Sequence, residues 1–308
     1  MTITQTKSTC CYCGTGCGVI IESDGINITD VRGDPDHPAN FGKLCTKGST
    51  LAMTMAPGAL SGRACHPEVR KTKSGQRSKT DWDATLAYLA ERFAATIREH
   101  GPNSVAFYVS GQLLTEDYYV FNKLAKGLIG TNNIDTKSRL CMSSAVTGYQ
   151  KTLGVDAPPC SYEDIDHAEC MFIAGSNTAY AHPVLFRRIE AAKANNPELK
   201  IIVVDPRRTE TAAFADLHLA ILPGTDVALF QAMLHVMLWE EWINRDYIAA
   251  HTENFNALRA LVREMSPDVA AEICGIRAED IVTAARWFSQ AKATLSLYCQ
   301  GLNQSTSG

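Results

Sequence analysis

Apolar residues recur at helical spacing in several stretches of this chain. Asp81 is placed to cap a helix that Gly101-Pro102 would end, and the apolar face of this helix is Leu86, Ala90, Phe93 and Ile97. Thr115 is expected to cap a second helix through about Leu128, with acidic residues in its first turn. Further helices are predicted over residues 183–194, 226–242, 254–265, 267–273 and 278–291.

Four runs of residues predict strands: 105–109 is a strand candidate, 170–174 and 200–204 are expected to be buried strands, and 294–299 is the last strand. Pro183 begins the helix that lies between the second and third of these runs, at the position where its missing N–H costs least. Residues 170–205 therefore predict one βαβ unit with parallel strands. The residues from Gly301 onward are expected to form a loop.

The pattern changes before residue 60, where Gly, Pro and Asp are frequent and the apolar stretches are short. We therefore predict two domains, a small β-rich unit over residues 1–60 and an α/β region over 61–308. Residues 63–79 carry six basic residues against one acidic residue and no aromatic residue. They are interpreted as a solvated connector, because nucleic-acid binding would favour aromatic side chains for stacking.

Composition excludes several classes of protein. The 308 residues have a net charge of −4, with 45% hydrophobic and 20% charged residues, which is ordinary for a folded protein and not for a disordered one. No apolar run approaches the ~18 residues that span a bilayer, so no membrane segment is expected. The mild acidity argues against nucleic acid as a partner.

Eleven cysteines are the most unusual feature of the composition. No secretory signal is visible before Thr9, so we expect a cytoplasmic location. In a reducing compartment these cysteines should not form a disulfide framework. Crowded cysteines in such a chain indicate metal or redox chemistry.

Cys10, Cys13, Cys17 and Cys45 follow the spacing C-x2-C-x3-C-x27-C. Three thiolates on a tight loop and one returning from afar can surround a [4Fe–4S] cluster, in which each iron needs one thiolate. The spacing favours a cluster over zinc, because a four-cysteine zinc site usually shows two C-x2-C pairs. Unrelated thiols are the third interpretation. The remaining Cys11 is expected to be a packed thiol.

A larger set of motifs resembles one family, the bis-molybdopterin guanine dinucleotide oxidoreductases, which includes bacterial nitrate reductases and formate dehydrogenases. The similar segments cover essentially the whole chain: Cys10 to Gly18, Leu44 to Gly48, Ser138 to Val146, Gly175-Ser176-Asn177 with His182-Pro183, Asp205 to Arg208, Leu222 to Asp226 and Gln300 to Gln304. The resemblance implies a small β-rich [4Fe–4S] domain followed by a Rossmann-like α/β molybdopterin-binding region that is incomplete at its C-terminus.

The resemblance also implies a second metal site. Cys141 corresponds to the residue that ligates molybdenum in the family, although a lone Cys between apolar residues would otherwise be interpreted as a core filler. Arg139 and Met142 would lie beside it, and Lys47 would connect the cluster to a pterin. One position departs from the family: nitrate reductases usually carry Asn where this chain has Lys137, and Lys can only donate hydrogen bonds.

Residues for the dinucleotide cofactor follow from the same resemblance, and several have a plausible structural role instead. The turn at Gly175 could hold a phosphate or be a plain connector, and Asp205 could accept from ribose or guanine or simply end a strand. His182 is better explained by helix-entry packing or capping than by metal ligation. The full set is Lys47, Gln112, Gly175, Ser176, Asn177, His182, Asp205, Arg207, Gly224, Thr225, Asp226, Gln300 and Gln304.

The implied reaction is the reduction of nitrate to nitrite at molybdenum, with electrons entering through the cluster. Met142 favours a nitrate reductase of the cytoplasmic assimilatory or the periplasmic type, because formate dehydrogenases of the family typically have His after the metal-binding Cys. Periplasmic members need a twin-arginine signal, and none is visible here, so we expect the assimilatory, cytoplasmic type. The electron donor would be a flavoprotein, ferredoxin or flavodoxin. The alternatives are a formate dehydrogenase, a non-catalytic iron–sulfur subunit and a zinc-binding module. We also expect a missing C-terminal part, without which this chain would be inactive.

Overall fold

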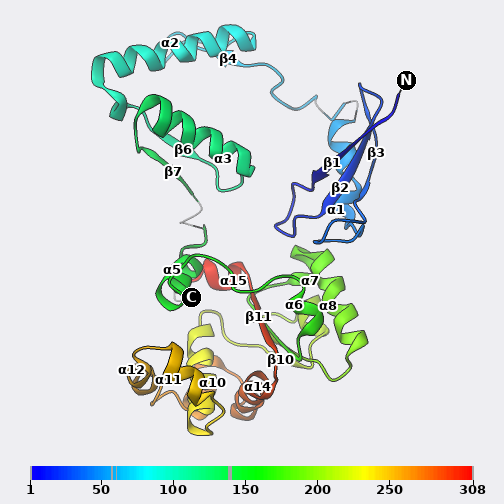
Figure 1. Ribbon diagram of the computed structural model, residues 1–308, viewed down its shortest axis with the longest axis vertical. Helices are drawn as coiled ribbons and strands as arrows, with labels where there is room; N and C mark the ends of the chain where they lie inside the picture. The colour runs from blue at the N-terminus through cyan, green and yellow to red at the C-terminus, as the bar shows by residue number, and fades with distance from the viewer. Residues whose placement is uncertain (1, 57, 60, 138–140, 307–308) are drawn as a thin grey trace. The chain divides into compact units, whose positions relative to one another are not determined.

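The computed structural model describes residues 2–56, 58–59, 61–137 and 141–306. Two compact units make up the chain: unit 1 comprises Met1–Ala52 and Ser144–Gly308, and unit 2 comprises Met53–Ser143. Figure 1 follows the chain through both units, and each unit is described below by itself.

Unit 1 begins with a three-stranded antiparallel sheet of β1 (Thr4–Thr9), β2 (Gly18–Ser23) and β3 (Ile28–Gly33). Strand β2 lies in the middle, and Val19 and Ile20 on it are buried while all of β1 is exposed. The short helix α1 (Thr46–Ser49) and the 3-10 helix η1 (Leu51–Met55) follow, η1 running across the boundary between the units. The connection between β1 and β2 in this small sheet carries Cys10, Cys13 and Cys17.

The second sheet of unit 1 has four parallel strands in the order β10-β9-β8-β11. Their bounds are β8 (Cys170–Ala174), β9 (Lys200–Val204), β10 (Leu217–Leu219) and β11 (Thr294–Tyr298). In register, Cys170 faces both Lys200 and Thr294, so β8 is central between β9 and β11. The chain therefore builds outward from β8 in one direction and then returns to add β11 on its other side.

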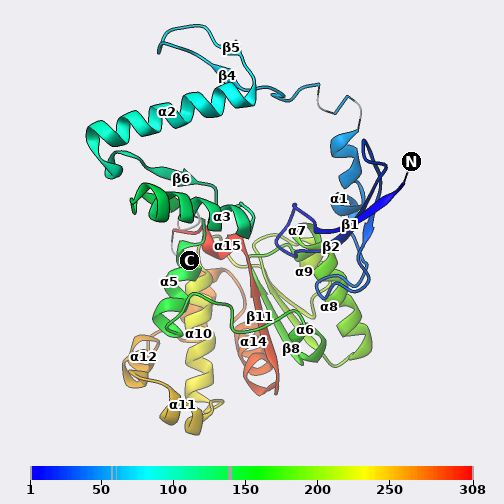
Figure 2. The ribbon, with the colours of Figure 1, turned by 45° about the horizontal axis from the view of Figure 1, so that its top comes forward.

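Helices cover both faces of this sheet, as Figure 2 shows. One face packs on α6 (Asp164–His167), α8 (Pro183–Asn195) and α9 (Glu210–Ala213), and the other on α10 (Asp226–Trp239), α13 (Pro267–Cys274) and α14 (Ala278–Gln290). Alternate residues of each strand point to opposite faces, so Phe172 enters one core while Met171 and Ile173 enter the other. The sheet is buried on both sides, which explains its continuous apolar runs.

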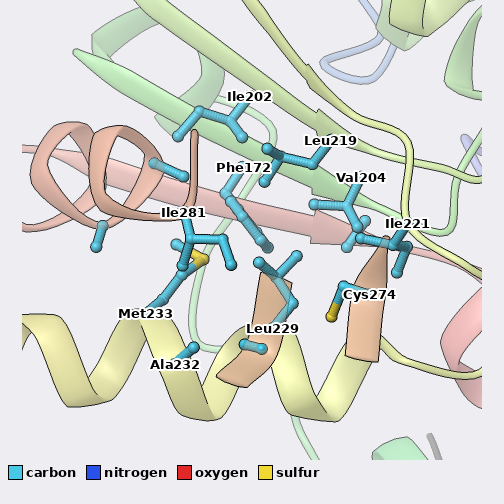
Figure 3. Close-up of a cluster of buried hydrophobic side chains, with 14 of the residues drawn as sticks. Phe172, Ile202, Val204, Leu219, Ile221, Leu229, Ala232, Met233, Cys274 and Ile281 are labelled. Atoms are coloured by element: carbon cyan, nitrogen blue, oxygen red, sulfur yellow. The ribbon is translucent and has the colours of Figure 1, made fainter. Parts of the chain in front are cut away.

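Figure 3 shows the core on the α10 face. Phe172, Ile202, Val204 and Leu219 of the strands meet Leu229 and Met233 of α10 and Ile281 of α14. The remaining elements of unit 1 are α5 (Ser143–Thr152), which begins at the last residue of unit 2, α7 (Thr178–Ala181), α11 (Arg245–His251), α12 (Phe255–Leu261) and α15 (Gln300–Asn303).

Unit 2 is smaller and carries two short sheets. Strands β4 (Glu68–Val69) and β5 (Ser78–Lys79) pair antiparallel, whereas β6 (Phe107–Val109) and β7 (Ile134–Thr136) pair parallel. Its helices are α2 (Trp82–His100), the 3-10 helix η2 (Pro102–Ser104), α3 (Thr115–Asn122) and the π-helix η3 (Lys123–Ile129). Phe107 stacks on Phe93 and meets Phe121 edge-on, which joins β6 to α2 and α3.

Several sequence predictions are confirmed. Asp81 caps α2 by accepting from the Ala84 amide at 2.7 Å, and Gly101 ends that helix. Both runs that predicted buried strands around Pro183 form strands with the predicted bounds, and they pair in parallel, which confirms the βαβ unit. The basic segment 63–79 holds the small β4–β5 hairpin within a largely exposed stretch.

Other predictions are wrong in detail. Thr115 is the first helical residue and not the cap, which is Leu114, and the helix continues after Asn122 as the π-helix η3. Residues 300–303 form α15 where a loop was expected. The strand at 105–109 is only Phe107–Val109, because its partner β7 offers just three residues.

Two helices are shorter than predicted for identifiable reasons. Helix α10 ends at Trp239, since Glu241 adopts a positive φ of 58°, which a helix does not allow. Helix α12 ends at Leu261, and the carbonyl of the next residue, Val262, accepts instead from His235 at 2.9 Å. Among the described residues, no helix is both long and apolar enough to cross a membrane.

Candidate cofactor-binding site

The cysteines that sequence spacing singled out line one pocket of unit 1. Cys10, Cys13, Cys17 and Cys45 surround it together with Lys47 and Pro183, where α8 begins. Cys10, Cys13 and Cys17 come from the β1–β2 connection and Cys45 from the residue before α1. The long 27-residue gap in the spacing therefore contains β2 and β3, whose fold returns Cys45 to the first loop.

Local hydrogen bonds hold the cysteine loop in place. The Cys10 amide donates to the Cys17 carbonyl at 2.8 Å and closes the loop. The buried side chain of Asn40 accepts from the Gly18 amide at 2.8 Å and donates to the Gly18 carbonyl at 3.1 Å. The Cys13 thiol lies 3.4 Å from Oγ1 of Thr15, which is itself buried. These contacts fix the backbone of the loop that carries Cys10, Cys13 and Cys17.

The thiols influence one another. Burial, followed by the charges of Cys13, Cys10 and Cys45, raises the pKa of Cys17 to about 11. Burial also raises the pKa of Cys10, with smaller contributions from the neighbouring cysteines. A site that disfavours several free thiolates becomes favourable once metal cations neutralise them, because thiolates are the metal-binding form.

The donor set fits an iron–sulfur cluster. Among the described residues, no group of three His, Cys, Asp or Glu side chains is arranged to hold a single metal ion. In a cubane each thiolate binds its own iron, so the four sulfurs do not have to meet at one point. Four cysteines and no other ligand type around one pocket are the ligands that such a cluster takes.

The structure shows that the prediction for Cys11 was wrong. This thiol is exposed and does not line the cysteine pocket, so it is not packed in a core. In the β1–β2 loop, Cys10 and Cys13 line the pocket, whereas Cys11 lies outside it.

Lys47 lies between two pockets. It lines the cysteine pocket, and it also lines an adjacent pocket with Pro183 and Arg187 of α8. Burial, and next the charge of Lys47, lowers the pKa of His182, the N-cap residue of α8. His182 makes no side-chain capping hydrogen bond.

Two backbones approach closely at the carboxyl edge of the four-stranded sheet. Gly175 directly follows β8, has φ of +58° and accepts from the Gly301 amide at 3.0 Å. A Cβ at Gly175 would lie 2.9 Å from the Gly301 Cα, so no larger residue fits without displacing backbone. This contact joins the ends of β8 and β11, on either side of the position where the strand order reverses.

Ser176 and Asn177 continue from this turn. The Ser176 hydroxyl lies 3.0 Å from that of Thr178, and Ser176 is buried. Asn177 accepts from the Thr211 hydroxyl at 2.9 Å and donates to Glu210 at 3.3 Å. The side chain of Asn177 is therefore anchored to α9, and these contacts shape the turn.

Acidic side chains gather at the same edge. Asp205 follows β9, is 8% exposed, and accepts from the Arg207 amide at 2.8 Å. Burial, and more weakly the charge of Asp205, raises the pKa of Asp226 at the start of α10. Two carboxyl groups near one another suit a ligand with several donors, such as a guanine edge or a ribose.

The other residues predicted for the dinucleotide lie on loops around this edge. Gly224 has φ of +85° and Thr225 donates to the Leu222 carbonyl at 2.7 Å, forming the turn before α10. Gln300 and Gln304 lie at the two ends of α15, after β11. Arg207 is exposed on the turn after β9. Apart from Gln112 and Lys47, the predicted set is thus clustered on connections that follow β8, β9, β10 and β11.

The residues predicted around molybdenum belong to unit 2. The Cys141 amide donates to the Lys137 carbonyl at 3.3 Å, and Cys141 and Met142 are both half-buried just before α5. Gln112 is exposed, and its amide donates to the Ser110 hydroxyl at 3.1 Å. Arg139 lies outside the described residues.

Sequence reasoning missed two side chains that reach the cysteine segments. The hydroxyl of Tyr162 donates to the Gly14 carbonyl at 3.1 Å, and the guanidinium of Arg187 donates to the Leu44 carbonyl at 2.7 Å. Burial, followed by the charges of Cys13 and Cys17, raises the pKa of Tyr162, so the phenol keeps its proton. The two partners are 148 positions apart in the first contact and 143 in the second, so no local pattern in the sequence could have revealed either contact.

Comparisons with known proteins agree with this architecture. Residues 63–308 match the molybdopterin oxidoreductase family, and residues 3–57 match the molybdopterin oxidoreductase Fe4S4 domain. The cofactors expected from the sequence, a [4Fe–4S] cluster and a molybdenum–molybdopterin cofactor, are those of the two matched domains.

Named relatives include enzymes with different substrates. A nitrate reductase of Klebsiella oxytoca is 47% identical over 99% of this chain and 34% of its own length. A periplasmic nitrate reductase of Desulfovibrio desulfuricans is 44% identical over 98% of this chain and 41% of its own length. The F420-dependent formate dehydrogenase 1 subunit alpha of Methanococcus maripaludis is 37% identical, covering 97% and 43% of the two chains. The chain thus spans well under half the length of these relatives.

A solved structure has the same fold. Acetylene hydratase from Pelobacter acetylenicus matches with a TM-score of 0.77 and 22% identity, over 96% of this chain and 40% of that one. Because the family match extends over most of the chain and the four cysteines of the Fe4S4 segment line one pocket, this chain belongs to the molybdopterin oxidoreductase family.

Proposed function

We propose that this chain is the cluster-bearing and dinucleotide-binding part of a molybdenum-dependent nitrate reductase that reduces nitrate to nitrite. The position of Lys47 carries the proposal most directly. It borders the four-cysteine pocket on one side and the start of α8 on the other, and α8 follows the Gly175 turn along the chain. An ammonium group at that position would connect the two predicted cofactor sites.

Each predicted residue has a role in this proposal. Cys10, Cys13, Cys17 and Cys45 would hold the [4Fe–4S] cluster, and Lys47 would stabilise added electrons by its positive charge. Cys141 would ligate molybdenum, with Arg139 favouring its thiolate form and Met142 beside it. When bound, the molybdenum cofactor supplies the oxygen-atom chemistry and the cluster supplies single electrons.

The carboxyl edge of the sheet would hold one guanine dinucleotide of the cofactor. The strand order β10-β9-β8-β11 reverses beside β8, and ligands of open α/β sheets bind at such a reversal. This order supports a Rossmann-like binding region. Asp205 and Asp226 would accept from the nucleoside, and Ser176 and Asn177 would face its phosphates. The remaining contacts would come from Gln112, Gly175, His182, Arg207, Gly224, Thr225, Gln300 and Gln304.

Formate oxidation is the second candidate. Formate dehydrogenase alpha subunits of methanogens are 33–38% identical to this chain, whereas the nitrate reductases reach 40–47%. Met142 in place of the His that formate dehydrogenases of the family typically carry favours nitrate.

Metal analysis combined with two assays tests the proposal on the full-length protein. We expect iron and molybdenum, nitrate reduction with reduced methyl viologen, and no formate-dependent dye reduction. Iron and molybdenum without nitrate turnover would contradict the proposed reaction. Zinc in place of iron would instead revive the zinc-binding module, and iron without molybdenum the electron-transfer subunit.

The proposal extends to partners and location. We propose a cytoplasmic, assimilatory enzyme that receives electrons from a flavoprotein, ferredoxin or flavodoxin. Because one relative at 44% identity is named as periplasmic, cell fractionation is the direct test of the proposed location. Activity recovered in the periplasmic fraction would contradict the location and leave the reaction unaffected.

A further inference from the structure

Two side chains of the α/β part of unit 1 donate to backbone carbonyls beside the cluster cysteines. Tyr162, which precedes α6, donates to Gly14 at 3.1 Å, and Arg187, on α8, donates to Leu44 at 2.7 Å. Gly14 lies between Cys13 and Cys17, and Leu44 directly precedes Cys45. Each segment that carries cysteines therefore receives one hydrogen bond from a distant part of the chain.

The accepting carbonyls belong to peptide groups within the two segments that carry the cysteines. The Leu44 carbonyl and the Cys45 amide form one peptide, and so do the Gly14 carbonyl and the Thr15 amide. A donor on a carbonyl polarises the peptide and strengthens its N–H as a donor, since hydrogen bonds in series reinforce one another. Both contacts therefore make the N–H groups of Thr15 and Cys45 stronger hydrogen-bond donors.

The placement of Arg187 is supported by its own helix. Pro183 and Val184 line the cysteine pocket, and Arg187 follows them by one turn on the same face of α8. The next residue, Arg188, instead donates hydrogen bonds to the Asp166 carboxylate of α6. Arg188 also lies 5.7 Å from the Phe41 ring centroid, a contact that holds α8 against the segment between β3 and α1.

Arg187 also adds charge. Among the described residues, Arg187 forms no ion pair and no hydrogen bond with a carboxylate. Its positive charge is therefore not neutralised by a carboxylate in contact. The reduction potential of an iron–sulfur cluster depends on net charge, on hydrogen bonds to the sulfurs and on solvent exposure. Adding one electron makes the cluster more negative, and nearby positive charge favours that state.

We infer that Tyr162 and Arg187 are positioning residues that raise the reduction potential of the cluster held by Cys10, Cys13, Cys17 and Cys45. This inference rests on the assignment of these cysteines as cluster ligands in the proposed function. Neither side chain touches a metal atom or a substrate in this role. They act through the peptide groups on which their hydrogen bonds fall, and Arg187 acts through its charge as well.

Potentiometric titration of the full-length protein, purified without oxygen, tests the inference. Four variants are compared: Arg187→Gln, Arg187→Lys, Tyr162→Phe and, as a control for charge alone, Arg263→Gln. Arg263 is exposed and far along the sequence from every cysteine of the site. Iron per chain and the electron paramagnetic resonance spectrum of the reduced cluster are recorded for each.

We expect iron content to stay at the level of the unmodified protein in all four variants. Arg187→Gln should shift the midpoint potential to a more negative value, Tyr162→Phe should shift it less in the same direction, and Arg187→Lys should keep most of the original value. Arg263→Gln should leave the potential unchanged. The pattern separates local charge and hydrogen bonding from the overall charge of the protein.

Three outcomes have distinct meanings. Unchanged potentials in Arg187→Gln and Tyr162→Phe, with the cluster present, would overturn the inference and leave the proposed function standing. Loss of iron in both variants would show that these contacts only hold the loop together, and would also overturn it. Absence of a cluster from the unmodified protein would instead contradict the proposed function itself.

Discussion

Buried apolar side chains are distributed unevenly between the cysteine-bearing region, residues 2–52, and the four-stranded sheet. In the cysteine-bearing region the buried apolar residues are Cys17, Val19, Ile20 and Val31. In the sheet every residue of β8 is buried, and so are four of the five residues of β9. Two cores, one on each face, hold the sheet between its helices.

The cysteine-bearing region is instead held by polar contacts and short loops. Asn40 bonds both backbone groups of Gly18, Lys7 pairs with Asp34 at 3.0 Å, and Tyr162 and Arg187 reach in from the α/β part of the unit. Little hydrophobic burial is available to stabilise this region, so bound metal should supply much of its order. The sheet should be stable without its cofactor. The predictions below test this contrast.

The largest effect is expected from removing a cysteine. Cys17→Ser should cost most of the bound iron, because an iron of a [4Fe–4S] cluster would lose its thiolate. The four-stranded sheet should survive, since its cores contain none of the cysteine-bearing region. Iron analysis and the visible absorbance of the protein measure the loss, and circular dichroism measures the fold.

The matched control for this prediction is Cys11→Ser. Cys11 is the exposed neighbour of the cysteine loop and lies outside the pocket, so iron content should not change. Equal loss of iron in Cys11→Ser and Cys17→Ser would show that the ligand set has been assigned incorrectly.

Shortening a buried side chain of the sheet should lower the stability of the protein strongly, whether or not metal is bound. Ile202 is fully buried on β9, and Ile202→Ala should lower the free energy of unfolding by about 2–5 kcal/mol through lost burial and a residual cavity. Denaturant unfolding measures the change. Ile26→Ala, at a residue 81% exposed in the β2–β3 turn, should change it by about 0.5 kcal/mol or less. Similar losses in the two variants would contradict the contrast between the regions.

An intermediate effect is expected at the edge where the sheet meets its cofactor. Gly175→Ala should cost about 1–3 kcal/mol, because the residue would be strained at positive φ and its Cβ would meet Gly301. Molybdenum content should fall as the turn moves. Gly154→Ala, also at positive φ but with open space around it, isolates the conformational cost, and only thermal stability should change there. Retention of both molybdenum and stability in Gly175→Ala would show that the close approach is dispensable.

The smallest effect is a pH dependence of the contact between α6 and α8. The hydrogen bonds from Arg188 lower the pKa of Asp166 below its ordinary 3.8. A carboxyl group whose pKa is lower in the folded than in the unfolded state stabilises the protein at pH values above the unfolded pKa. This stabilisation is lost as the pH falls through the folded pKa. The Asp166 side chain is 47% exposed, so we expect under about 1 kcal/mol.

Asp166→Asn measures this contribution. The stability difference between the variant and the unmodified protein should be constant from pH 5 to 7 and shrink below about pH 4, where Asp166 takes up a proton. Thermal denaturation at a series of pH values records it. A difference that grows toward low pH would contradict the sign of the linkage.

Part of the fold was accessible from local patterns in the sequence. The buried strands β8 and β9 and the helix that begins at Pro183 are marked by continuous apolar runs and by proline at the first helical position. Strand β10 and helix α11 were not predicted, because a strand of three residues and a helix of seven residues give too little periodicity. Helix boundaries failed where a distant group decided them, as His235 does for α12.

The candidate site divides in the same way. The spacing of Cys10, Cys13, Cys17 and Cys45 predicted a shared pocket, and the structure brings all four together. The same spacing could not show that Cys11 is turned outward, nor that Lys47 borders two pockets. These features depend on how the β1–β2 loop bends and on how α1 packs beside α8.

A resemblance of motifs along the whole sequence indicated the family. Local patterns in the sequence determined the cysteine ligand candidates, the parallel βαβ unit and the turn after β8. These properties depend on spacing and periodicity within a few tens of residues, which the covalent chain imposes directly. Only the tertiary structure decided that Tyr162 and Arg187 reach the cysteine segments and that Gly175 meets Gly301. Such contacts join residues more than a hundred positions apart, and their partners are selected by the packing of whole elements, which no local pattern records.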